Sequence, residues 1–233
     1  LAGRATEKER LYIEAAYARR VEKNPEKELA VYRQITAQYP REKDAHSKLA
    51  VIYQTKKMYP EAIAELNTAL DLDPQWPVAL NQLGYLYLVR NDMARAEEYL
   101  KKAVAAAPDD ANPLDSLGEL CFRLGRLDEA LAHYKQAVRI KPDFGSEDIM
   151  AYIDAVKGDY AEAVNLLDQF ILATPSKDWQ TLGYWWKAIY KFIRGQREQA
   201  KTDMIRVEAS WRSVENKSGA AVAELVQAYF CFE

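Results

Sequence analysis

The amino-acid sequence predicts an all-α solenoid built from stacked antiparallel helix pairs. The main observation is a period of 34 residues, over which small, large apolar and proline positions return in the same order. Three columns carry this period most clearly: Ala62, Ala96 and Ala130; Pro74, Pro108 and Pro142; and Leu49, Leu83 and Leu117. A fixed period of this length is typical of helical repeat proteins, in which each unit buries its apolar face against its neighbours.

The order of residue types within one period indicates a helix, a tight turn and a second helix. Two helices approach closely only where their side chains are small, and large apolar side chains one turn away fill the space beside the contact. We therefore expect Ala50, Gly84 and Ala96 at helix crossings, and Leu66 and Leu100 in the core. The prolines follow the second helix, where the missing N–H and the fixed φ end it.

These columns resemble the tetratricopeptide repeat family, whose unit reads W-x-x-L-G-x-x-Y, then A-x-x-x-F, then P. The matching positions of two consecutive units are Leu80, Leu83, Gly84, Tyr87, Ala96, Leu100 and Pro108, and then Leu114, Leu117, Gly118, Cys121, Ala130, Tyr134 and Pro142. The resemblance implies a right-handed superhelical array that binds protein or peptide partners in a concave groove.

The repeat pattern is expected to cover residues 1–233 as one domain of about six repeats and a terminal helix. The expected boundaries are about 6–42, 43–76, 77–110, 111–143, 144–175 and 176–214 for the repeats, and 218–233 for the terminal helix.

The outer repeats depart from the pattern. The first begins with a capping pair, Thr6 and Glu9, and has Glu28 where a small residue is expected. In the fifth, Asp154 replaces an aromatic residue, which predicts a thinner core. In the sixth, Ala200 lies five residues after the position that the repeat pattern predicts for the small residue of the second helix. This shift predicts a first helix about one turn longer.

Composition limits the possible partners and compartments. The chain has 32 basic and 35 acidic side chains and a net charge of −3, whereas nucleic-acid binding depends on clustered positive charge. No apolar stretch approaches the ~20 residues that span a bilayer. We therefore expect neither a nucleic-acid partner nor a membrane span. Cys121, expected in the core, and Cys231 provide no disulfide framework.

The compartment is left open by the sequence. The chain begins at Leu1 without methionine, which is typical of a processed protein or an excised fragment. A soluble protein is expected and a cytoplasmic location is slightly favoured, with a periplasmic or secreted location as the alternative because the native N-terminus is missing.

Catalytic and cofactor-binding motifs are missing from the sequence. It contains no G-x-S-x-G, P-loop, H-E-x-x-H or G-x-G-x-x-G pattern. His46 and His133 fall at or beside core columns and are expected to pack rather than to bind a metal. We therefore expect no cofactor, no metal site and no enzymatic activity.

The family resemblance implies binding positions on the first helix of each repeat. These positions are Asn81, Tyr85 and Leu88 in the third repeat, and Asp115, Glu119, Phe122 and Arg123 in the fourth. An asparagine beside a tyrosine suits a peptide backbone, because the amide both donates and accepts hydrogen bonds and the ring adds apolar area. The alternative is a set of ordinary solvated side chains.

The charge of these positions indicates which ligand they favour. One subset of the family holds acidic chaperone C-termini with lysine, arginine and asparagine side chains, but the equivalent positions here are Ser47, Val51, Gln82, Asn112 and Ser116. Carboxylates at Asp115, Glu119 and Asp148 predict a neutral or basic ligand instead.

An aromatic segment, residues 179–192, provides a second candidate surface. Trp179, Leu182, Gly183 and Trp186 are expected in the core, Tyr184, Lys187 and Lys191 are expected to face the groove, and Trp185 and Phe192 lie on neither face. The surplus aromatic residues indicate either an interface or a well-packed last repeat.

The terminal segment, residues 218–233, has no clean polar face. Its apolar residues include Leu225, Val226, Tyr229, Phe230 and Phe232. Because the last helix of a repeat array needs a polar outer face, this segment predicts self-association or a truncated array.

Taken together, these patterns predict a non-catalytic scaffold that binds a peptide or protein segment in the concave groove. The alternative is a regulatory or sensor segment of a larger bacterial signalling protein whose kinase or DNA-binding domain is absent from this chain.

Overall fold

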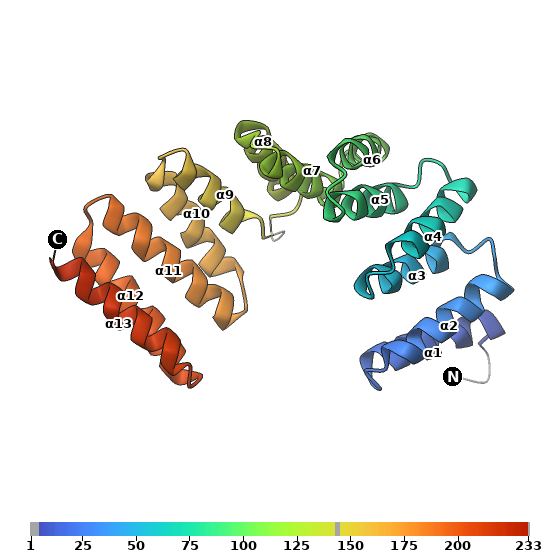
Figure 1. Cartoon of the computed structure of the whole chain (residues 1–233), viewed down its shortest axis with the longest axis horizontal. Helices are drawn as coiled ribbons and strands as arrows, with labels where there is room; N and C mark the ends of the chain where they lie inside the picture. The colour runs from blue at the N-terminus through green and yellow to red at the C-terminus, as the bar shows by residue number, and fades with distance from the viewer. Residues whose placement is uncertain (1–4, 143–144, 233) are drawn as a thin grey trace. The chain divides into compact units, whose positions relative to one another are not determined.

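The computed structural model describes residues 5–142 and 145–232 (Figure 1). These residues form 13 α-helices and no β-strand, which confirms the all-α prediction. The first seven helices are α1 (Glu7–Arg20), α2 (Pro25–Gln38), α3 (Lys43–Thr55), α4 (Tyr59–Leu72), α5 (Pro77–Val89), α6 (Met93–Ala106) and α7 (Ala111–Arg123). The remaining six are α8 (Leu127–Ile140), α9 (Glu147–Val156), α10 (Tyr160–Ala173), α11 (Lys177–Ile193), α12 (Arg197–Ser213) and α13 (Lys217–Phe232).

The helices are arranged as six consecutive pairs followed by α13. Each of the six expected repeats contains one pair, and the prolines at 74, 108 and 142 follow α4, α6 and α8. The chain divides into two compact units, which we call unit 1 (Leu1–Leu124) and unit 2 (Gly125–Glu233). The division falls between α7 and α8, inside the fourth expected repeat, and a single solenoid over 1–233 stays a prediction.

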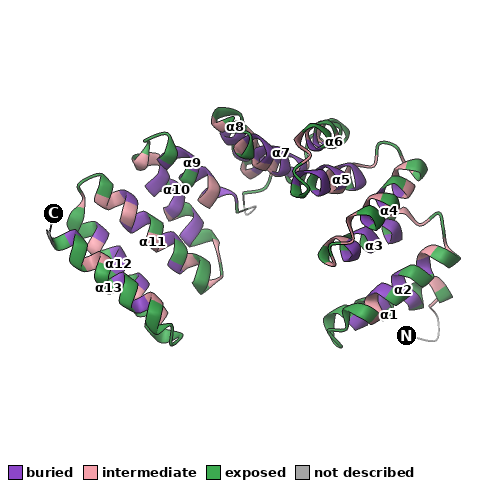
Figure 2. Cartoon of the chain, in the orientation of Figure 1, coloured by how far each residue is buried: buried purple, intermediate pink, exposed green. Residues whose placement is uncertain are grey.

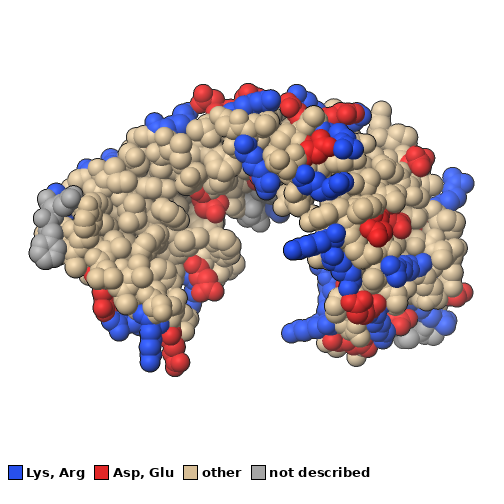
Figure 3. All heavy atoms as spheres, in the orientation of Figure 1, with Lys and Arg blue, Asp and Glu red and all other residues tan. Residues whose placement is uncertain are grey.

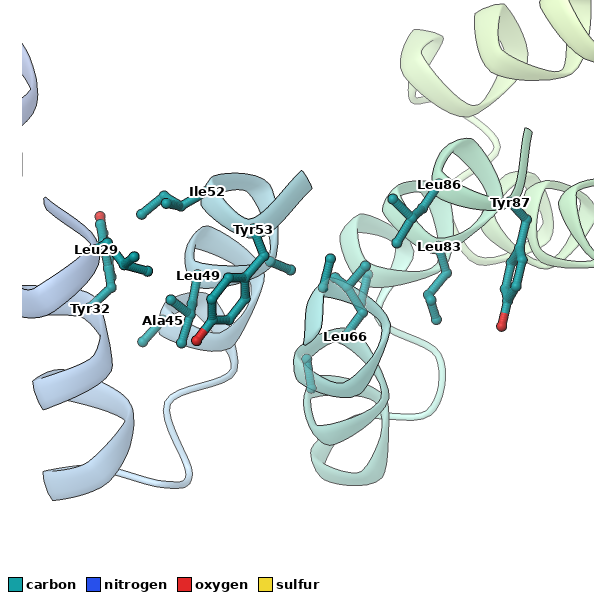
Figure 4. Packing of buried hydrophobic residues seen from close by; sticks show 14 of the residues in the cluster. Leu29, Tyr32, Ala45, Leu49, Ile52, Tyr53, Leu66, Leu83, Leu86 and Tyr87 are labelled. Carbon is teal, nitrogen blue, oxygen red and sulfur yellow. The ribbon is translucent and has the colours of Figure 1, made fainter. Parts of the chain in front are cut away.

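In unit 1, neighbouring helices pack in chain order from α1 to α7. The first helix α5 also contacts α3 and α7 directly, so the three first helices lie side by side. The buried residues of this unit lie between the helices (Figure 2). Figure 4 shows Leu29 of α2 directed toward α3, and Leu66 of α4 directed toward Leu83 of α5. All three leucines belong to one apolar cluster.

The small crossing residues occupy the positions that the period predicts. A Cβ atom on Gly84 would lie 2.6 Å from Cγ of Leu100, so only glycine allows α5 and α6 to approach this closely. Ala96, on the opposing helix, is fully buried. The helix crossing is therefore as tight as the sequence implied.

Replacing Ala96 with leucine should lower the free energy of unfolding by about 1–3 kcal/mol, because the larger side chain overpacks this crossing. Urea denaturation of both proteins measures the difference. Ala94→Leu is a matched control, since Ala94 lies on the same helix but is exposed. An Ala96→Leu protein as stable as the control would show that Ala96 does not lie at a close crossing.

A single residue in the left-handed region closes each turn within a helix pair. These residues are Lys23, Lys57, Asn91, Gly125, Gly158 and Gly195, and Glu215 plays the same part before α13. The φ angle is 60° at Lys57 and 62° at Asn91. Glycine adopts this conformation without strain, whereas lysine and asparagine accept it because the helices on both sides impose it.

The N-terminal cap of α1 is formed as the sequence predicts. The Glu9 backbone N–H donates to Oγ1 of Thr6 over 3.3 Å, and the Thr6 backbone N–H donates to Oε2 of Glu9 over 2.7 Å. These bonds satisfy N–H groups that the helix itself leaves unpaired. The Thr6 backbone N–H and the Thr6 hydroxyl both donate to the Glu9 carboxylate, and these two bonds lower its pKa.

In unit 2, the helices again pack in chain order, from α8 to α13. The helix α11 has 17 residues, compared with 13 in α5, which confirms the longer first helix predicted for the sixth repeat. Asp154 is buried on α9, its Oδ2 has no hydrogen-bond partner in the described part of the chain, and burial raises its pKa.

The aromatic residues Trp185 and Phe192 pack inside unit 2. The Trp185 ring lies 5.4 Å from that of Trp211 on α12, and the Phe192 ring stacks on that of Phe230 at 4.3 Å. Of the two interpretations of the surplus aromatics, these contacts favour a well-packed last repeat. On α13, Phe230 is buried, whereas Val222, Leu225 and Tyr229 are exposed.

The prediction that Trp179, Leu182 and Trp186 belong to the core was wrong. Trp179 is 52% exposed, and the other two are also exposed. The core face of α11 passes through Gly183, where an added Cβ would lie 2.6 Å from Cγ1 of Ile171. The three large residues lie beside that face, and α9, with 10 residues, cannot cover all of α11.

Candidate functional site

The first candidate site lies on the first helices of unit 1. Along α5, exposed Val78, Tyr85 and Val89 share a stripe with Asn81, since residues three, four and seven apart lie on one side of a helix. On α7, the neighbouring helix, Asp115, Glu119 and Arg123 follow the same spacing. We call Asn81, Tyr85, Val89, Asp115, Glu119 and Arg123 the α5–α7 face.

The charged residues of this face partly neutralise one another. The Arg123 guanidinium lies 2.5 Å from the Glu119 carboxylate and donates to the backbone carbonyl of Leu88 over 3.5 Å. An exposed pair of this kind contributes only about 0.3–0.5 kcal/mol to stability. It leaves the face less acidic than Asp115 and Glu119 alone imply.

The side chains of Asn81 and Tyr85 have no hydrogen-bond partner among the described residues, and the Asn81 Oδ1 atom is buried. Burial raises the pKa of Tyr85, the Glu119 carboxylate raises it further, and Arg123 opposes that effect. The phenol therefore stays neutral at physiological pH and can both donate and accept a hydrogen bond.

Other predicted binding residues lie elsewhere. Leu88 is fully buried in the core of unit 1, so its assignment to the groove was wrong. It lies seven residues after the half-buried Asn81, at the edge of the stripe where α5 packs against other helices. Phe122 is half-buried on α7.

The three predicted residues of α11 belong to the packing between α10, α11 and α12. Lys187 is only 7% exposed, and its Nζ pairs with Asp168 and lies 3.9 Å from Oδ2 of Asp203. Lys191 pairs with the same Asp203 at 2.7 Å, and the Tyr184 ring lies below the guanidinium of Arg206 at 5.3 Å. Placing Lys187 in the groove was therefore wrong: it follows Gly183 by one turn and faces the same neighbouring helices.

Unit 2 contains a second candidate site, which the sequence reasoning missed. A pocket of about 150 Å³ opens between α9, α10 and α11, and we call it the α9–α11 pocket. It is lined by Asp148, Ile149, Tyr152, Leu167, Phe170, Leu182, Gly183, Trp186 and Tyr190. In Figure 3 the surface over α10 and α11 is mostly uncharged, whereas unit 1 shows many charged side chains.

The pocket combines aromatic rings with one carboxylate. The rings of Trp186 and Tyr190 stack at 6.0 Å, and burial together with the neighbouring Tyr152 and Tyr160 raises the pKa of Tyr190 to about 12. Burial also raises the pKa of Asp148. A signal was present in the sequence: Ile149, Tyr152 and Val156 have the same three-and-four spacing as the large residues of α11.

The structure also bears on metal binding and on membrane crossing. His46 is buried, with Nδ1 2.5 Å from Oε2 of Glu65 and Nε2 3.0 Å from the carbonyl of Pro40. In the described part of the chain, no three His, Cys, Asp or Glu side chains gather in a way that would hold a metal ion. Within those same residues, no helix combines the length and apolar character that crossing a membrane requires.

Comparison with known proteins identifies the family. The tetratricopeptide repeat family matches residues 15–77 and again residues 77–143, together more than half of the chain. The general transcriptional corepressor ssn6 of Schizosaccharomyces pombe is 29% identical over 121 residues, which are 51% of this chain and 11% of that protein. The chain spans less than a quarter of the length of the curated relatives it matches.

Solved structures show the same fold. The pilF protein of Pseudomonas aeruginosa superposes with a TM-score of 0.74 at 18% identity, covering 92% of this chain and 95% of that one. PilW, described as a widely conserved type IV pilus biogenesis factor, superposes with a TM-score of 0.68 at 18% identity over 98% and 96% of the two chains. The helix pairs, the 34-residue period and the family matches agree: this chain belongs to the tetratricopeptide repeat family.

Proposed function

We propose that this protein is a non-catalytic interaction scaffold that binds an extended peptide segment of a partner protein on the α5–α7 face. Folds of this family commonly serve as protein–protein interaction scaffolds. The observation that carries the proposal is the pair Asn81 and Tyr85, whose side chains form no hydrogen bond within the described part of the chain.

An extended peptide offers backbone groups that can pair with the side chains of Asn81 and Tyr85. Its backbone N–H and C=O groups are unpaired, so the Asn81 Nδ2 group can donate to a carbonyl and the Tyr85 hydroxyl can accept from an N–H. The Tyr85 ring and the exposed Val89 offer apolar area beside that amide. The face carries two carboxylates, Asp115 and Glu119, and one guanidinium, Arg123, which favours a neutral or weakly basic segment.

The test uses short peptides selected from a random displayed library on the wild-type protein. We expect Asn81→Ala with Tyr85→Ala to weaken binding of the selected peptide at least about tenfold. The double variant loses the hydrogen bonds of both side chains and the contact with the tyrosine ring. Fluorescence anisotropy measures the affinity, and thermal unfolding should change little. The matched control is Asn67→Ala with Tyr17→Ala, which removes the same two side-chain types at exposed positions of unit 1.

Two results would count against the proposal. Peptides that bind wild-type and double variant equally would place the binding surface elsewhere. A double variant that unfolds would show that Asn81 and Tyr85 are packing residues.

The remaining expectations stay predictions: self-association through residues 218–233, the lack of a nucleic-acid partner, the lack of catalysis and the compartment. The exposed stripe of Val222, Leu225 and Tyr229 on α13 supports the first of them. The alternative of a regulatory segment in a bacterial signalling protein gains no support from the similarities described above.

A further inference from the structure

The α9–α11 pocket is a built concavity in unit 2, separate from the α5–α7 face. Leu167 and Phe170 of α10, both buried, lie against it, and Tyr152 and Trp186 are partly exposed beside it. Its volume of about 150 Å³ suits one large side chain. A single residue of a partner can therefore enter it.

The carboxylate of Asp148 has no cation in the described part of the chain. Its Oδ1 accepts a hydrogen bond from the backbone N–H of Ile149 over 2.8 Å, and none of the ion pairs among the described residues includes it. Burial raises its pKa, two backbone hydrogen bonds oppose that rise, and no basic side chain contributes. Among the described residues that line the pocket, Asp148 is the only charged one.

Elsewhere in this chain, the same combination of groups holds a basic side chain. The Nζ of Lys43 lies 4.9 Å from the ring centre of Trp76 and 2.5 Å from Oδ2 of Asp73. The Arg95 guanidinium similarly lies 4.5 Å from the ring centre of Tyr87 and pairs with Asp92. In both cases a ring face and a carboxylate act together on one cation.

We propose that the α9–α11 pocket binds a lysine or arginine side chain of a partner protein, with the Asp148 carboxylate on the cationic head and the rings of Tyr152 and Trp186 on its stem. The long apolar stem of such a residue fits the apolar walls, and the charged head reaches the Asp148 carboxylate. A glutamate would instead meet the charge of Asp148.

This inference is independent of the proposed function, because it uses other residues in the other unit. The Asn81→Ala, Tyr85→Ala variant should still bind basic peptides at the pocket, so the failure of one proposal leaves the other standing.

The experiment uses peptide mixtures of one length that differ in a fixed central residue: arginine, citrulline, leucine or glutamate. Citrulline has the shape of arginine without its charge. We expect the arginine mixture to bind wild-type protein about tenfold more tightly than the citrulline mixture. We expect Asp148→Asn to remove that preference and Trp186→Ala to weaken binding of both. Asp178→Asn and Trp179→Ala are matched controls, because both residues are exposed on α11 and neither lines the pocket.

Several outcomes would overturn the proposal. Leucine or citrulline bound as tightly as arginine would mean that the pocket takes an uncharged residue and that the charge of Asp148 plays no part in binding. An unchanged arginine preference in Asp148→Asn, or no binding by any mixture, would equally overturn it. Because Asp148→Asn keeps the size of the side chain, it tests the charge even if Trp186→Ala fails to fold.

Discussion

Asp203→Ala should lower the free energy of unfolding of unit 2 by about 3–5 kcal/mol, the usual loss when one partner of a buried ion pair is removed. Asp203 is only 2% exposed. Its carboxylate lies 2.7 Å from Nζ of Lys191, 3.2 Å from the guanidinium of Arg206 and 3.9 Å from Nζ of Lys187. Without it, Lys191 and the buried Lys187 lose a counter-charge that water cannot replace.

Urea denaturation followed by circular dichroism measures this loss. Glu198→Ala is the matched control, since Glu198 lies on the same helix and pairs with Lys201, but its side chain is 86% exposed. An exposed pair of that kind contributes at most about 1 kcal/mol. If Asp203→Ala destabilises unit 2 no more than Glu198→Ala does, the ion pairs of Asp203 do not stabilise unit 2 as a buried ion-pair network would. Asp203→Asn, which keeps the shape, should cause a comparable loss.

Phe230→Ala should lower the free energy of unfolding by about 3–5 kcal/mol, because a buried ring leaves a cavity. Phe230 is 2% exposed, and its ring stacks on Phe192 of α11 at 4.3 Å. It belongs to the same apolar cluster as Met204 and Val207 of α12. The ring therefore anchors α13 to both preceding helices.

Thermal unfolding, together with amide hydrogen exchange of α13, measures this effect. Leu225→Ala on the same helix is the control, because Leu225 is 70% exposed and should change stability little. Equal effects of the two substitutions would mean that α13 is not anchored through Phe230. Faster exchange confined to α13 would show that the helix detaches before the rest of unit 2 unfolds.

Much of the fold was predictable, because close helix packing restricts which residues each crossing accepts. Gly84 and Ala96 lie where α5 and α6 are too close for a larger side chain, and the same restriction returns in each repeat. The turn residues were not predicted. Lys57 and Asn91 adopt a left-handed backbone conformation because the helices on either side determine it. Nothing in the residue types themselves predicts that conformation.

The candidate site was predictable only in part. Asn81 and Tyr85 are half-buried or exposed on α5, as the family pattern implies, but Leu88 on the same helix is buried. On α11, the match to the family pattern predicted that Trp186 is buried in the core, but it is exposed and lines the α9–α11 pocket. A pattern of residue types specifies helices and crossings, whereas the exposure of a given side chain depends on the neighbouring helices.

The sequence by itself determined that the chain forms helix pairs, where those pairs begin and end, and which small residues lie at their crossings. These properties follow from local contacts that recur every 34 residues. Only the tertiary structure decided that Lys187 is buried against Asp168 and Asp203, and that Asp148 shares a pocket with Trp186. Those arrangements depend on the lengths and packing of α9, α10, α11 and α12 together, which no single repeat encodes.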